Sequence, residues 1–102
     1  LEKAWGDNAE AMGVEIRYQD EPPGSSDVGN ISHLMPTIQP RLAICDPSVN
    51  IHSTDFADAT QSEMGKTALL LAAKTLAMTV YDYLTQAELR RTAAEDFAGA
   101  AR

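Results

Sequence analysis

The spacing of apolar residues predicts helices at both ends of the chain. Residues 2–12 repeat apolar side chains every three or four positions and stop before Gly13. Residues 63–84 carry the strongest helical pattern, because alanine and leucine recur at that spacing without an interrupting proline. A last helix is predicted over 86–97, with Thr85 as the N-cap of a capping box. The apolar face predicted for the long helix consists of Ala68, Leu69, Ala72, Ala73, Leu76, Val80 and Leu84.

Two short apolar runs between these helices predict β-strands. Residues 14–18 alternate apolar and polar side chains, and residues 41–45 form a compact apolar run bounded by prolines. Helices combined with two or three strands predict an α/β fold of short strands and a long C-terminal helix. Because so small a sheet is a poor domain centre, the remaining strands are expected from elsewhere in a longer parent chain.

Two loops have the most unusual composition. The first begins at Gly24, where a glycine, two serines and an aspartate share one turn, and it predicts a short helix capped by Asp27 and ended by Pro36. Loops of this kind often hold a ligand. The second, residues 46–65, is predicted as a polar loop with one short apolar stretch before His52.

The charge and amino-acid composition of the chain limit the kinds of molecule that it is expected to bind. The net charge of −7, from 15 acidic and 8 basic residues, provides no basic surface for a nucleic acid duplex. No apolar run is long enough to span a bilayer, so no membrane partner is predicted. The single cysteine, Cys45, cannot form an internal disulfide and is interpreted as a small buried apolar residue in a cytoplasmic protein. The chain begins at Leu1 without a methionine, which suggests a piece of a longer protein or a processed product.

Few side chains are candidates for chemistry. His52 follows an apolar stretch, and a histidine at a strand end can offer a ring nitrogen to zinc, although a surface or core role is the commoner one for it and for His33. Neither Ser25 nor Ser26 has a visible base nearby, so a serine nucleophile is not supported. Four acidic residues could take part in a metal or acid–base site, or could simply cap helices and face solvent. They are Asp27, Asp55, Asp58 and Glu63.

Three segments together carry a family resemblance. GSSDVGNISHLMPTIQP (24–40), IHSTDFADATQSEMG (51–65) and AAKTLAMTVYDYL (72–84) resemble the two-zinc aminoacylase and amidohydrolase metallopeptidases, in particular the aminobenzoyl-glutamate hydrolase and dipeptide-hydrolase branch. The match covers about residues 4–97. It implies a three-layer α/β/α catalytic domain with an inserted lid that often dimerises. Residues 1–102 would then be the C-terminal segment of that catalytic domain, without the lid or the N-terminal half.

The resemblance also assigns roles. His52 matches the final metal ligand of the family. The family's loop on the substrate side of the metals corresponds in this chain to Gly24, Ser25, Ser26, Asp27 and Gly29. In that family two metals activate a water molecule, and a glutamate moves its proton to the leaving amine. The segments with the glutamate and the other ligands have no match in this chain. We therefore expect no catalytic residue and at most one zinc ligand in this segment, and no activity from it alone. Gln39 stands where some relatives place a histidine.

These features predict part of a zinc-dependent amidohydrolase acting on N-acyl amino acids or small peptides. Its partners would be that substrate, the rest of the parent chain and, in a homo-oligomer, a second copy. One alternative is a non-catalytic interaction or dimerisation module that associates through exposed edge strands. Another is a free-standing small-molecule binding domain that uses the loop at residues 24–29.

Overall fold

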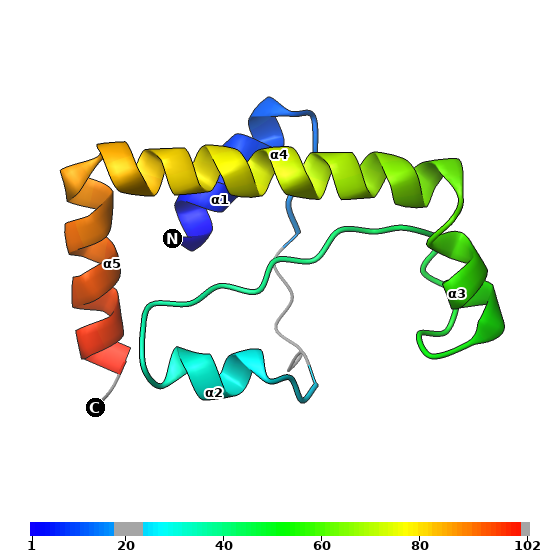
Figure 1. Cartoon of the computed structure of the whole chain (residues 1–102), viewed down its shortest axis with the longest axis horizontal. Helices are drawn as coiled ribbons and strands as arrows, with labels where there is room; N and C mark the ends of the chain where they lie inside the picture. Colours follow the sequence, from blue (N-terminus) through cyan, green and yellow to red (C-terminus); the bar gives the residue numbers. More distant parts are fainter. Residues whose placement is uncertain (18–23, 101–102) are drawn as a thin grey trace.

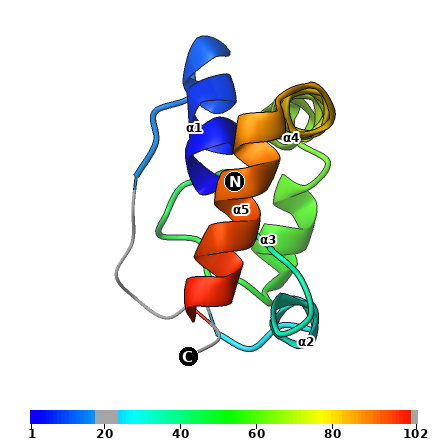
Figure 2. The same ribbon diagram turned by 90° about the vertical axis from the view of Figure 1, so that its left-hand side faces the viewer.

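The long helix α4 is the axis of the structure, a computed structural model that describes residues 1–17 and 24–100. The helices are α1 (Glu2–Ala11), α2 (Val28–Ser32), α3 (Thr54–Ala59), α4 (Glu63–Thr85) and α5 (Ala87–Ala100). In Figure 1, α1 crosses behind α4. Helix α3 lies below the first turn of α4, and α5 runs downward from the last turn of α4. The view turned by 90° places α1 beside α4 and α2 at the opposite end of the molecule (Figure 2).

The core lies between α1 and α4 and consists largely of small side chains. Trp5 and Ala9 are buried on α1, and Ala68, Thr75 and Thr79 are buried on α4. Thr75 is fully buried, and its hydroxyl donates to the backbone carbonyl oxygen one turn earlier at 2.8 Å. A threonine that satisfies its hydroxyl within its own helix can be buried without an unpaired polar group. The small side chains of α4 therefore let α1 approach closely.

A polar contact fixes α1 against the second half of α4. Asn8 Nδ2 donates to Asp82 Oδ2 at 2.8 Å and to Thr79 Oγ1 at 3.3 Å. The other carboxylate oxygen of Asp82 accepts from Gln86 Nε2 at 2.9 Å. A hydrogen bond to an ionised group contributes about 1.5–3 kcal/mol when it is not fully exposed. This contact therefore adds a directional restraint to the apolar contact between the two helices.

The corner between α4 and α5 is held by one arginine. Arg90 Nη1 donates to the carbonyl oxygens of Tyr83 (2.7 Å) and Leu84 (2.8 Å), which lie at the end of α4 and lack partners within the helix. On α5, Ala93 is buried and Phe97 is half-buried.

The predicted capping box at the start of α5 is wrong. Thr85 is the last residue of α4, and its hydroxyl donates to the carbonyl oxygen one turn back at 2.8 Å instead of capping α5. Glu88 forms an ion pair with Arg91. The physical reason is that α4 continues one residue further than predicted, so that no non-helical N-cap position is left at Thr85.

The face that α4 buries also differs from the predicted one. Ala68 and Ala72 face inward as expected, but Thr75 and Thr79 complete the buried arc in place of leucines. The long apolar side chains expected in the core are instead largely exposed: Leu69 by 69%, Leu76 by 48%, Val80 by 56% and Leu84 by 68%. The reason is that α1 packs on a narrow arc of small residues, while the neighbouring arc has no partner among the described residues.

The predicted α/β fold is wrong for the described part of the chain. Helices hold 62% of these residues and none lies in a strand, so residues 14–17 and 41–45 do not form the strands expected of a three-layer α/β/α domain; Tyr18 lies outside the described residues. A strand exists only where its backbone groups pair with a neighbouring strand. An apolar run supplies the side-chain pattern of a strand but not that partner. Among the described helices, none is long and apolar enough to cross a membrane.

Candidate functional site

The glycine–serine loop is organised by Ser26. Gly24 adopts a φ of +76°, in the left-handed region that favours glycine. Ser26 Oγ accepts hydrogen bonds from the Val28 amide and from Gln39 Nε2, both at 3.2 Å. Asp27 stands at the N-cap of α2 but makes no side-chain cap bond, so the predicted capping role belongs to the neighbouring serine. The loop is exposed and is tied through Gln39 to the extended chain that follows α2.

His52 occupies a turn with unusual backbone geometry. Its φ is +67°, a left-handed value that it alone adopts among the described non-glycine residues. Such a conformation is uncommon outside glycine, although histidine adopts it more readily than branched residues, and it often marks functional positions. The side chain is exposed. Ser53 holds both sides of the turn, because its hydroxyl donates to the Asn50 carbonyl oxygen at 2.6 Å and accepts from the Phe56 amide at 3.1 Å.

A close backbone approach at Gly65 fixes α3, and with it the turn of His52, against α4. A Cβ atom at Gly65 would lie 2.4 Å from the carbonyl oxygen of Ala59 and 2.9 Å from that of Thr60. Ser62 caps α4 at the same joint, accepting from the Gly65 amide at 3.0 Å and donating to the Ala59 carbonyl oxygen at 2.7 Å. Only a residue without a side chain fits between the two helices at this point.

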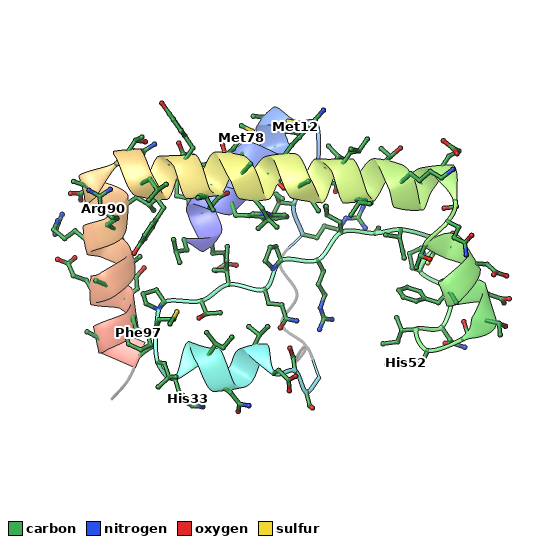
Figure 3. The ribbon with its side chains drawn as sticks, in the orientation of Figure 1. Met12, His33, His52, Met78, Arg90 and Phe97 are labelled. Atoms are coloured by element: carbon green, nitrogen blue, oxygen red, sulfur yellow. The ribbon has the colours of Figure 1, made fainter. Side chains whose placement is uncertain are left out.

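The candidate histidines and the glycine–serine loop lie on the side of the molecule away from α4 (Figure 3), whereas Glu63 is the first residue of α4, and the candidates do not meet. Figure 3 shows His52 below α3 and His33 at the end of α2, at separate places along that side. Among residues 1–17 and 24–100, no group of three or more His, Cys, Asp or Glu side chains could hold a metal ion. The acidic candidates Asp55, Asp58 and Glu63 are exposed and do not form a ligand cluster with His52.

Two open grooves lie elsewhere. One, of about 520 Å³, runs between Val14, Leu42 and the first turns of α4. The other, of about 340 Å³, lies beside the contact of Asn8 with Asp82. Neither groove is lined by His52 or by the glycine–serine loop.

Sequence reasoning missed two features that shape this side of the molecule. The polar loop predicted for residues 46–65 contains α3, and the signal for it was Ser53, a good N-cap residue placed before a short run that can form a helix. The hydrogen bond from Gln39 to Ser26 joins residues 13 positions apart, and no local sequence pattern predicts it.

Comparison with curated proteins places these residues in context. The chain is 35% identical to the Xaa-Arg dipeptidase of Homo sapiens over 101 residues, which cover 95% of this chain and 23% of the relative. The chain is homologous to part of a dipeptidase. The Xaa-Arg dipeptidase of Mus musculus is 31% identical over 98 residues, 92% of this chain and 22% of the relative. No family model and no solved structure matches.

The coverage limits what this homology establishes. The chain spans less than a quarter of the length of the curated relatives it matches. The relation to peptide hydrolases agrees at a coarse level with the resemblance noted in the sequence, whereas zinc and the roles of individual residues remain predictions.

Proposed function

We propose that this chain forms part of a metal-dependent hydrolase of dipeptides or N-acyl amino acids, as the C-terminal segment of its catalytic domain. In this proposal His52 supplies one metal ligand, and the loop formed by Gly24, Ser25, Ser26, Asp27 and Gly29 faces the substrate. The main support is the homology to Xaa-Arg dipeptidases over nearly the whole chain. The observation that points to His52 is its exposed imidazole on a left-handed turn held by Ser53.

The described residues can contribute one ligand to a metal site, but they do not form a complete site. A catalytic zinc site uses three protein ligands and a water molecule, and no cluster of that kind exists among the described residues. The remaining ligands and the proton-transferring group therefore have to come from other polypeptide. In the isolated chain, we expect neither amide hydrolysis nor stoichiometric zinc binding.

A chimera tests the assignment of His52. In the human Xaa-Arg dipeptidase, the segment aligned with this chain would be replaced by residues 1–102, and dipeptide hydrolysis and bound metal would be measured. We expect His52→Asn to lower kcat/KM by at least about 10- to 100-fold, because loss of a direct ligand should cost no less than loss of a residue that only orients one. Asparagine tolerates the left-handed backbone, so the substitution removes the imidazole with little strain.

The matched control is His33→Asn, the same chemical change at an exposed histidine just after α2. It should leave activity and metal content unchanged. Full activity and full metal content in the His52→Asn chimera would contradict the assignment of His52. The loop is tested separately by Ser26→Ala, which should raise KM more than it lowers kcat if the loop positions substrate.

A non-catalytic interaction module is the second candidate. The observation in its favour is the exposed apolar surface of α4. Association through edge strands, the form in which this alternative was predicted, lacks its basis in the described residues because they contain no strand.

A further inference from the structure

Helix α4 is apolar almost all the way round, although α1 covers only one arc of it. A second arc, next to the buried one, carries Leu69, Leu76, Val80 and Leu84, all exposed by 48% or more. We call these four residues the α4 stripe. Between Thr67 and Tyr81 the only charged residue is Lys74, which lies about 160° around the helix from Leu76. A helix that is apolar on nearly every side is normally buried inside a larger protein or a membrane.

The membrane is not supported as the environment of this helix. Among the described helices, α4 included, none is long and apolar enough to cross a bilayer. A larger protein is the other environment in which such a helix is normally buried.

The whole chain, and not the α4 stripe alone, exposes more surface than a compact domain of its mass. The chain has 7984 Å² of accessible surface, whereas a folded monomer of its mass exposes about 5,600 Å². Its radius of gyration is 15.3 Å, against about 13 Å for a compact domain of this length. The excess of about 2,400 Å² is some three times the area of about 800 Å² that each partner buries in a standard interface. A single dimer contact of that size would leave most of it uncovered.

We propose that the α4 stripe is the face on which the rest of a larger catalytic domain packs, through an apolar surface of its own. This inference rests on the proposed function, in which the chain is one segment of that domain. The relatives have more than four times the length of the aligned segment, which is enough polypeptide to cover the excess area. The occupant is thus the complementary polypeptide of the hydrolase and not a second copy of this segment.

The test compares one substitution in two settings, the isolated 102-residue chain and the dipeptidase chimera described above. Leu76→Asp should leave the far-UV circular dichroism of the isolated chain unchanged and shift its Tm by less than about 2 °C, since the side chain already faces solvent. In the chimera the same substitution should lower Tm by more than about 5 °C, because it would bury a carboxylate. The control is Lys74→Asp, on the other side of the same helix, which should be tolerated in both settings.

Two results would overturn the proposal. One is a chimera whose Tm is the same with Leu76→Asp as with Lys74→Asp. The other is an isolated chain that sediments as a defined dimer and becomes monomeric with Leu76→Asp, which would make a second copy the occupant. A third outcome tests the proposed function alone. If Leu76→Asp destabilises the chimera while His52→Asn leaves its activity intact, the docking face is supported and the assignment of His52 as a metal ligand is wrong.

A measurement in trans covers the case in which the chimera does not accumulate. The human dipeptidase lacking its aligned segment would be co-expressed with the tagged 102-residue chain. Recovery of the complement with the wild-type chain and the Lys74→Asp chain, but not with the Leu76→Asp chain, supports the proposal. Equal recovery with all three, or with none, counts against it.

Discussion

The two sides of this molecule are held together by different means. The scaffold, formed by α1, α4 and α5, contains every fully buried residue of the described chain, and its helices are joined by the contacts of Asn8 and Arg90. The site-bearing side, residues 24–62, has no fully buried residue and is held by short-range turns and serine hydrogen bonds. Segments with few buried contacts open at low free-energy cost. The scaffold is therefore expected to be stable without a partner, whereas the proposed site depends on one.

The largest expected effect comes from the scaffold. Trp5 is 8% exposed and anchors α1, so Trp5→Ala should lower the free energy of unfolding by about 3–5 kcal/mol. Trp5→Phe is the matched control, because it retains most of the apolar volume and removes an indole Nε1–H that has no partner among the described residues. Urea denaturation followed by circular dichroism measures both. Equal losses for the two variants would mean that apolar packing is not the main contribution of this residue.

An intermediate effect is expected at the joint between the two sides. Gly65→Ala places a Cβ atom against the backbone of α3 and should cost about 1–3 kcal/mol, with faster amide exchange in residues 54–60. Gly99→Ala is the contrasting change, since a Cβ there meets nothing within 4 Å and alanine favours the helix by up to about 1 kcal/mol. If Gly65→Ala were as stable as wild type, α3 would not be fixed through this contact.

The smallest effect is confined to the site-bearing side. The hydroxyl of Ser48, at 2.6 Å, and its amide, at 2.9 Å, donate to Asp46 Oδ1 and hold the pKa of this carboxyl below its ordinary value of 3.8. A lowered folded-state pKa stabilises the turn at pH values above 3.8, and this contribution is lost as the pH falls through the folded-state pKa. Ser48→Ala should raise the pKa toward 3.8, as measured by NMR titration of the Asp46 carboxyl. An unchanged pKa would contradict the role of the hydroxyl.

Sequence reasoning located the helices whose signals lie within their own residues. It missed the features that depend on contacts with other parts of a protein. The helices 2–12 and 63–84 were predicted to within one residue at each end, because their propensity and spacing lie within the helices themselves. The strands at 14–18 and 41–45 failed because pairing requires a neighbour that no local pattern specifies. The inward face of α4 failed for a related reason: periodicity identifies apolar arcs but not which arc a second helix will cover.

The candidate site shows the same division. The family resemblance singled out His52 and the glycine–serine loop, and the structure adds the positive φ of His52, the bond from Gln39 to Ser26 and the close approach at Gly65. These additions are contacts or backbone angles, which composition and spacing do not encode. Whether His52 binds metal stays a prediction that the chimera tests.

The contact of Asn8 with Asp82 has a consequence for the timing of protein synthesis. The two residues are 74 positions apart, and a ribosome adding about 5–20 residues per second needs about 4–15 s to cover that distance. Helix α1, with the indole of Trp5, therefore emerges well before the surface that will shelter it exists. During that interval its apolar face has no cover from α4, and its docking is a late event in the biogenesis of this polypeptide.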